Sequence, residues 1–215
     1  MSAPSLRVSW LGRAPYEVVE TEQEALRCAV LEGRGEEAFL LVEHEAVVTL
    51  GRHADDRFLR LSAQALAGLG VALRRSRRGG DVTYHGPGQL VGYPVVRVGK
   101  AVRAHVEAMA TAICEALEPL GVRPVYRADR PGLWLGEDKL AAFGVHVSRG
   151  VAIHGFALNV TTPPAAFGVI VPCGLVGCGV TSLHLLVPEP PSLERLGRTI
   201  AARFAAHTGR VALAG

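Results

Sequence analysis

Charged side chains are missing from one long stretch of this chain. No Asp, Glu, Lys or Arg occurs between residues 151 and 187, although such residues make up 20% of the whole 215-residue sequence. Cysteine is scarce too, with four residues, and no basic segment followed by an apolar run opens the chain as in a secretory signal. We therefore expect reduced thiols in a cytoplasmic protein rather than a disulfide framework.

Long uninterrupted apolar runs are also absent. The most apolar part, residues 165–180, contains Pro172 and several glycines and is too short to cross a bilayer as a helix, so we expect a soluble protein without membrane association. A net charge of +3 provides no overall attraction to polyanions, and no nucleic-acid partner is expected. The hydrophobic content of 49% excludes a disordered chain, and the length fits a single domain over residues 1–215.

Hydrophobic periodicity predicts helices interspersed with strands. Helices are predicted at residues 15–33, 62–69, 102–120 and 192–207. Strands are predicted at residues 5–11, 38–42, 46–50, 71–75, 90–98, 133–135, 139–147 and 151–160. The last two strands flank the tight turn Ser148-Arg149-Gly150 and should form an antiparallel hairpin. The pattern indicates an α/β (α+β) fold, in which mixed, largely antiparallel sheets are flanked by helices.

One cysteine, Cys173, lies within the uncharged stretch, in Val171-Pro172-Cys173-Gly174. Most free cysteines are small buried hydrophobes, and Cys173 could be one of them. The alternative is a nucleophile, which requires a nearby cation or base because a free thiol is mostly protonated at neutral pH. The uncharged stretch provides neither, so the partner must come from elsewhere in the chain. Our candidate for that partner is Lys139.

A second segment with unusual composition is Arg77 to Gln89, where five glycines and prolines indicate backbone that is bent to approach something closely. Arg78 adjoins Gly79-Gly80, so its guanidinium and backbone N–H groups could converge on one ligand, although no phosphate-binding GxxxxGK[ST] motif is present. His85 could be a catalytic base or only a hydrogen-bonding anchor. The neighbouring arginines, Arg74, Arg75 and Arg77, are either a solvated face or a contact for phosphate or an acidic partner.

Metal ligands are not arranged in a recognisable pattern. Cys173 and Cys178 have four residues between them, and the nearest histidines, His154 and His184, complete no zinc motif. We expect neither a metal nor a cofactor.

Three blocks of sequence, in order, resemble the octanoyltransferases of lipoate biosynthesis, within the biotin/lipoyl protein ligase superfamily. The blocks are Arg78-Gly79-Gly80-Asp81-Val82-Thr83-Tyr84-His85-Gly86-Pro87-Gly88-Gln89-Leu90, continuing to Tyr93-Pro94; Lys139-Leu140-Ala141-Ala142-Phe143-Gly144 through to His154-Gly155-Phe156-Ala157-Leu158-Asn159; and Pro172-Cys173-Gly174, followed by Gly179-Val180-Thr181-Ser182-Leu183. The segment Thr49-Leu50-Gly51-Arg52 is similar to a fourth block, and the resemblance covers residues 40 to 185. A second thiol at Cys178 departs from the pattern and leaves some choice over which cysteine reacts.

The resemblance implies the catalytic-domain fold of biotin and lipoyl protein ligases, with Cys173 as acyl-thioester nucleophile and Lys139 lowering its pKa and moving protons. It also implies substrate contacts from three groups of residues: Arg78, Gly79, Gly80, Asp81, Val82, Thr83, Tyr84 and His85; Ala142, Phe143 and Gly144; and Gly155, Phe156 and Ala157. The implied donor is octanoyl-acyl carrier protein. The implied acceptors are the lipoyl domains of 2-oxoacid dehydrogenase complexes and the glycine cleavage H protein, with the enzyme acting as a monomer.

The implied chemistry suits the composition, because an apolar slot walled by residues such as Val82, Phe143 and Phe156 could hold an eight-carbon chain with roughly 5 kcal/mol of burial energy. Three alternatives stay open. An ATP-dependent lipoate- or biotin-protein ligase would need no cysteine nucleophile, a noncatalytic acyl- or lipoyl-binding module would form no adduct, and a Cys–His mechanism would depend on His85 instead of Lys139.

Overall fold

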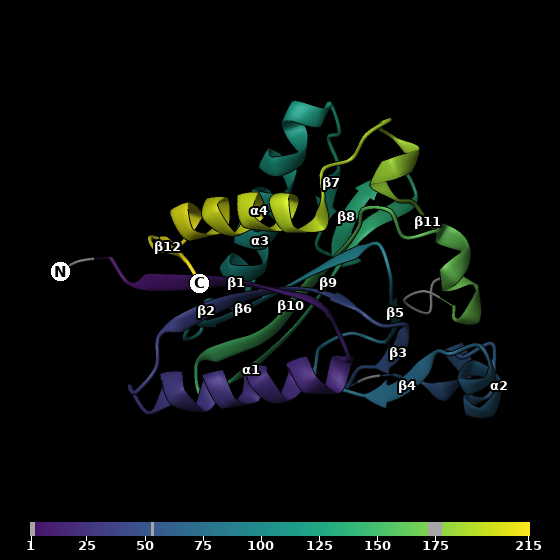
Figure 1. The fold of residues 1–215 in the computed structure, drawn as a ribbon, viewed down its shortest axis with the longest axis horizontal. Coiled ribbons are helices and arrows are strands. Elements are labelled where there is room, and N and C mark those ends of the chain that lie inside the picture. The colour runs from purple at the N-terminus through teal and green to yellow at the C-terminus, as the bar shows by residue number, and fades with distance from the viewer. Residues whose placement is uncertain (1–2, 53, 172–177) are drawn as a thin grey trace.

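The computed structural model describes residues 3–52, 54–171 and 178–215 (Figure 1). The helices are α1 (Tyr16–Leu31), α2 (Ala63–Gly68), α3 (Val102–Leu117) and α4 (Leu193–His207). The strands are β1 (Ser5–Ala14), β2 (Glu37–His44), β3 (Val47–Leu50), β4 (Ala72–Arg75), β5 (Val82–His85), β6 (Gln89–Arg97), β7 (Val125–Arg127), β8 (Gly132–Leu135), β9 (Asp138–Ser148), β10 (Val151–Asn159), β11 (Gly179–Val180) and β12 (Val211–Ala214).

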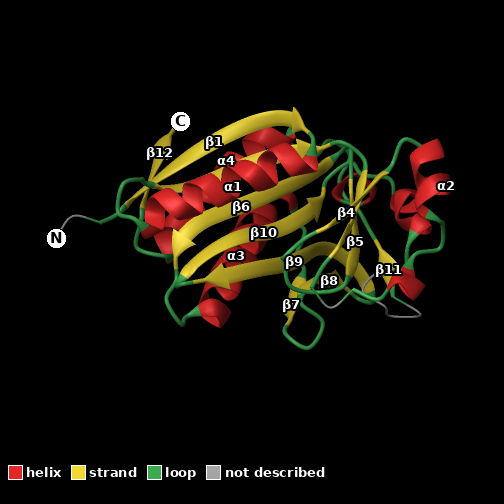
Figure 2. Cartoon of the chain, turned by 90° about the horizontal axis from the view of Figure 1, so that it is seen from below, coloured by secondary structure: helices red, strands yellow, loops and turns green. Residues whose placement is uncertain are grey.

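A large mixed sheet forms the centre of the molecule, with strand order β12-β1-β2-β6-β10-β9-β8-β7 and β11 paired to β9. Helix α1 covers one face through β10, β6 and β2, and α3 and α4 cover the other, so the sheet is the middle of three layers (Figures 1 and 2). Every residue of β10 is buried, as expected for a strand covered on both faces. The main core lies between the sheet and the α3–α4 pair, with smaller clusters beneath α1.

A second sheet of three short strands, in the order β4-β3-β5, lies at one end of the large sheet together with α2 (Figure 2). Its own core contains Val48, Leu50, Leu66 and Tyr84, and Phe167 from the 3-10 segment Pro164–Val169 closes it. Strand β5 leads directly into β6, so the small sheet is held against the end of the large one. This junction is where the candidate site is found.

The predicted mixed α/β architecture is confirmed, including the β9–β10 hairpin, in which Gly144 pairs with Gly155 and Phe143 with Phe156. The pairing is more varied than the hairpin alone suggests, because β1 runs parallel to both β2 and β12 and β3 runs parallel to β4. Strand β5 was not predicted: its four residues lie in the segment expected to be irregular, between glycines and prolines, and pairing with β3 forms the strand.

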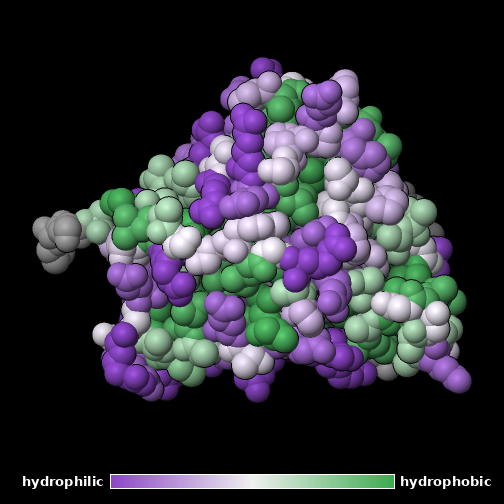
Figure 3. Space-filling model, viewed as in Figure 1, coloured by the Kyte–Doolittle hydropathy of each residue, from purple (hydrophilic) through white to green (hydrophobic). Residues whose placement is uncertain are grey.

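Polar and apolar side chains mix on the surface, and the face seen in Figure 3 shows hydrophilic residues interspersed with smaller hydrophobic areas. Among the described residues, no helix is long and apolar enough to cross a membrane.

Candidate active site

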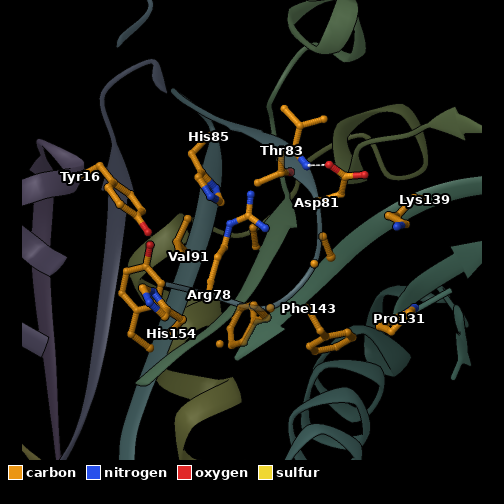
Figure 4. Close-up of a pocket in the computed structure, with 18 residues that line it drawn as sticks. Tyr16, Arg78, Asp81, Thr83, His85, Val91, Pro131, Lys139, Phe143 and His154 are labelled. Carbon is orange, nitrogen blue, oxygen red and sulfur yellow. Dashed lines mark hydrogen bonds between the residues drawn. The ribbon is translucent and has the colours of Figure 1, made fainter. Parts of the chain in front are cut away.

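A cavity lies where the small sheet meets the large one (Figure 4). Its walls come from the start of α1, the loop before β5, β5 itself, and the middle of β6, β9 and β10. The lining residues are Tyr16, Arg78, Gly80, Asp81, Val82, Thr83, His85, Val91, Tyr93, Pro131, Lys139, Ala142, Phe143, Gly144, His154, Gly155, Phe156 and Ala157. The cavity therefore combines apolar walls with histidines, tyrosines, one arginine and one lysine.

Arg78 holds the loop before β5 in place. Its Nε donates to Thr49 Oγ1 (3.0 Å), one terminal nitrogen donates to Thr49 O (2.6 Å) and the other donates to Gly79 O (3.0 Å). The residue is only 8% exposed, and these neutral acceptors from β3 and from the loop itself satisfy N–H groups of its buried guanidinium. In this structure the guanidinium positions the glycine-rich loop, and its side chain also forms part of the cavity wall.

The glycines of this loop allow it to lie directly on β9. Gly79 N donates to Val145 O at 3.0 Å. A Cβ added to Gly144 would approach Gly79 O to 3.1 Å, and one added to Gly79 would approach Val145 O to 3.1 Å. Both contacts are tighter than nine in ten real Cβ contacts, so the close approach of loop and strand favours glycine on each side.

Lys139 lies on β9 and is 8% exposed. Its Nζ is 4.6 Å from the ring centroid of Trp134, a cation–π distance, and Arg127 and Arg130 also place guanidinium groups over the same indole. On its other side Lys139 pairs with Val180 of β11. The chain that follows residue 177 thus returns directly beside this lysine.

A buried hydrogen-bond network joins the sequence blocks that surround the cavity. His85 Nδ1 is 2.8 Å from Gln89 Oε1, and Gln89 Nε2 donates to Tyr84 O (3.3 Å) and to Asn159 Oδ1 (2.9 Å). Asn159 Nδ2 donates to Thr181 O, and Thr181 N donates to Lys139 O. Burial lowers the pKa of His85 to about 3, so the imidazole is neutral at physiological pH and acts as a donor at Nδ1.

Most of the residues predicted to contact substrate do gather around one cavity. Two do not line it: Gly79 lines an adjoining open cleft, and Tyr84 packs edge-on against Phe167 in the small core. Lys139 shares the cavity with them, whereas Cys173 lies outside the described residues. Sequence reasoning missed Tyr16 and Pro131, whose positions follow only from the tertiary fold, and Val91, which lies inside the first quoted block. Tyr93 and His154 lie inside the quoted sequence blocks and could have been chosen.

The remaining candidates lie elsewhere or carry other contacts. Arg74 pairs with Glu17 and Arg77 lies 3.8 Å from Glu24, and both arginines are exposed. The Cys178 sulfur accepts a hydrogen bond from Arg130 at 3.3 Å. Within the described part of the chain, no three His, Cys, Asp or Glu side chains are grouped to hold a metal ion.

Comparisons with known proteins agree with one another. A family model described as the lipoyl protein ligase A/B catalytic domain matches residues 14–205. An octanoyltransferase of Alkaliphilus metalliredigens is 40% identical over 203 residues, which is 93% of each chain. One of Solibacter usitatus is 42% identical over 204 residues, covering 94% of this chain and 90% of the relative.

Solved structures share the fold at low sequence identity. A bi-partite lipoate protein ligase from Thermoplasma acidophilum, described with its E2 lipoyl domain, has a TM-score of 0.74 at 15% identity and covers 100% of this chain and 87% of its own. A lipoate-protein ligase A bound with ATP has a TM-score of 0.74 at 14% identity, covering 100% and 89%.

The three-layered fold is thus that of lipoate-protein ligase catalytic domains. The closer sequence matches narrow the assignment: the chain belongs to the octanoyltransferase family, a family of acyltransferases.

Proposed function

We propose that this protein transfers an octanoyl group from octanoyl-acyl carrier protein to a lysine of lipoyl domains, through a thioester on Cys173. The acceptors are lipoyl domains of 2-oxoacid dehydrogenase complexes and the glycine cleavage H protein. In this proposal residues 1–215 form one catalytic domain that works as a cytoplasmic monomer. The names of the 40%-identical relatives support octanoyl transfer, and the lipoyl domain named with the Thermoplasma ligase supports the class of acceptor.

The observation that carries the proposal is the shared cavity, in which Lys139 lies beside the predicted substrate contacts on β5, β9 and β10. The wall next to Lys139 includes Ala142, Phe143 and Ala157, a surface suited to an alkyl chain. At about 0.8 kcal/mol for each buried CH₂, such a wall discriminates strongly between octanoyl and much shorter chains. Polar groups for the reaction and apolar groups for binding are thus supplied together.

The proposed reaction has two steps. In the first, the Cys173 thiol loses its proton to Lys139, the sulfur attacks the thioester carbonyl, and the carrier thiolate leaves and regains a proton. In the second, the acceptor lysine amine attacks the new thioester, the Cys173 sulfur leaves, and the amine proton is taken up by the site. Exchange between thioesters is nearly neutral, whereas the amide product is much more stable, so no ATP is consumed.

Lys139 is favoured over His85 as the proton carrier. His85 has a pKa of about 3 because of burial, and its Nδ1 is occupied by Gln89. An imidazole with so low a pKa is a poor base at neutral pH, since catalytic efficiency favours a pKa near the working pH. Lys139 is buried, faces the same cavity and lies beside the chain that returns from the segment containing Cys173.

The proposal is tested by incubating the purified protein with octanoyl-acyl carrier protein and measuring its intact mass. We expect one octanoyl adduct on the wild type, none on Cys173→Ala, and a greatly slowed adduct on Lys139→Ala. Cys178→Ala is the matched control and should acylate like the wild type. Addition of a lipoyl domain without ATP should then remove the adduct and octanoylate the domain. A strict requirement for ATP would indicate a ligase instead, and tight binding without any adduct would indicate a noncatalytic module.

A further inference from the structure

An open cleft adjoins the cavity at Lys139. Its volume of about 780 Å³ is within the range of small-molecule sites. The residues that line both spaces are Gly80, Asp81, Pro131, Lys139, Phe143 and Gly144. Figure 4 shows Lys139 and Pro131 together on one side of the cavity, with Phe143 near them. A ligand whose reacting atom lies beside Lys139 can therefore extend one arm into the cavity and a second arm into the cleft.

Lys139 and Arg103 mark opposite ends of this cleft. Lys139 is the second residue of β9, so it lies where the strand begins. Gly99 N donates to Gly150 O at 3.0 Å, in the turn that follows β9, and α3 begins three residues later at Val102. Arg103 therefore lies toward the end of β9, far from Lys139 along the strand.

The length of the cleft suits a ligand longer than the acyl group. β9 contributes Lys139 and Val145 to the cleft, and the six-residue step between them corresponds to roughly 20 Å of strand. An extended octanoyl chain covers about half of this distance. The phosphopantetheine arm that carries the acyl group on acyl carrier protein has about thirteen bonds from sulfur to phosphorus, or about 15 Å at the reach per bond of an extended polypeptide. The arm thus fits the cleft in length.

Apolar side chains line much of the cleft. Val102 and Val106 come from α3, and Phe143 and Val145 come from β9. Tyr126 packs edge-on against Phe143, with the ring centroids 5.8 Å apart. These surfaces suit the methylene groups and the paired methyl groups of the arm, which gain free energy when they leave water.

Strand β9 also has an open edge next to the cleft. Its pairing with β8 ends where Ala142 lies opposite Gly132. Among the described residues, no strand pairs with Phe143 to Ser148 on the side of β9 opposite β10. The two amide groups of the arm resemble peptide bonds, so they can form hydrogen bonds with backbone groups along this edge as extended peptides do.

Charges around the cleft favour an anion at the Arg103 end. The Arg103 guanidinium is exposed and pairs with Glu107 on the next turn of α3 at 2.8 Å. An exposed pair of this kind is weak, so it does not prevent a contact with phosphate. The carboxylates that line the cleft have other contacts, because Asp81 accepts two backbone N–H groups and Asp129 lies 3.8 Å from Arg130.

We propose that the open cleft holds the phosphopantetheine arm of the donor, with the thioester beside Lys139, the acyl chain in the cavity and the phosphate beside Arg103. This inference rests on the proposed function, because it takes acyl carrier protein as the donor. It adds the place where the donor arm binds and the residue that recognises its phosphate.

Binding of an unreactive analogue tests the cleft without any transfer. S-octyl-4′-phosphopantetheine is a thioether, so it has no carbonyl for a thiol to attack. It is titrated into the wild-type protein by calorimetry, beside S-octylpantetheine, which lacks the phosphate. The phosphorylated thioether should bind about threefold to tenfold more tightly. Equal affinities would overturn the proposal, and AMP that displaces the phosphorylated thioether at micromolar concentration would assign the cleft to a nucleotide instead.

Two variants locate the binding within the cleft. Arg103→Gln should abolish the preference for the phosphorylated thioether and leave binding of S-octylpantetheine within about twofold. Arg198→Gln is the matched control, since Arg198 makes a similar pair with Glu194 on α4 and does not line the cleft. Val106→Trp should fill the cleft and weaken both thioethers about tenfold or more. Octanoic acid should still bind within about twofold, because Val106 is not among the residues that line the cavity.

Two outcomes in these variants would refute the cleft as the site of the arm. One is a phosphate preference that survives Arg103→Gln. The other is an equal loss of affinity for the thioethers and for octanoic acid in Val106→Trp. Absence of an octanoyl adduct in the transfer experiment, by contrast, would count against the proposed function and leave these affinities unchanged.

Discussion

Replacing Gln89 with leucine should destabilise the protein and disorganise the site, since this amide connects three separate segments. Gln89 is 2% exposed and makes three side-chain hydrogen bonds, to His85, to the Tyr84 carbonyl and to Asn159. Leucine fills a similar volume but leaves these three groups unpaired in the interior. At about 1 kcal/mol for each net hydrogen bond, the free energy of unfolding should fall by about 3 kcal/mol.

Urea unfolding followed by circular dichroism measures this change, with the midpoint and slope fitted separately. Gln64→Leu is the matched control, because Gln64 is exposed on α2 and its replacement should change stability by no more than about 0.5 kcal/mol. In a double-mutant cycle with Asn159→Leu, the second replacement should cost less once Gln89 is gone. A loss below about 1 kcal/mol for Gln89→Leu, or fully additive effects, would show that the network does not act as described.

Three further predictions concern the same structure. The pKa values of His44 and His105 are lowered to about 4 and those of His85 and His154 to about 3, mainly by burial, so the unfolded chain binds more protons than the folded one between about pH 4 and 6.5. The free energy of unfolding should therefore fall as pH drops through this window, by up to about 1.4 kcal/mol per pH unit for each histidine. His105→Gln should reduce the slope of the free energy of unfolding against pH by the equivalent of about one proton. A free energy of unfolding that does not change with pH would contradict the buried, neutral histidines. Gly155→Ala places a Cβ 2.2 Å from Gly92 O and should cost more than about 2 kcal/mol in urea unfolding, whereas Gly68→Ala at the end of α2 has open space and should be neutral or slightly stabilising. Trp134→Leu removes the indole beside Lys139 and should slow acylation by octanoyl-acyl carrier protein more than it weakens binding of octanoic acid; an equal loss in both would indicate a general packing defect.

The secondary structure could be predicted largely because hydrophobic periodicity is local. Ser62 and Ser192, the first residues of two predicted helices, cap those helices through side-chain hydrogen bonds, and Gly150 has a positive φ in the tight turn predicted between β9 and β10. Strand β12 was not predicted, because its four residues are all exposed and only parallel pairing with β1 forms the strand.

The site was predictable where the chemistry lies in contiguous blocks, and not where it depends on tertiary packing. The loop at Arg78, the Lys139 strand and the Gly155 region were found from sequence and do meet around one cavity. Tyr16 reaches the cavity only because α1 crosses the sheet there, and no local pattern marks it. The positive φ of His154 lies where the β10–β6 register brings it opposite Pro94, sixty positions away, and no local sequence pattern predicts that pairing.

Strand β9 carries both Lys139 and the cavity wall at Ala142–Gly144, and its pairing with β10 fixes their relative positions. The spacing between the proposed reactive end and the binding wall is therefore set in increments of one strand repeat, about 6.6 Å for every two residues, instead of being continuously adjustable. Enzymes of this fold that bind acyl groups of different length should therefore differ in the side chains along β9, while the backbone of the strand stays the same. Insertions within β9 should be selected against, because they would shift Lys139 relative to the binding wall.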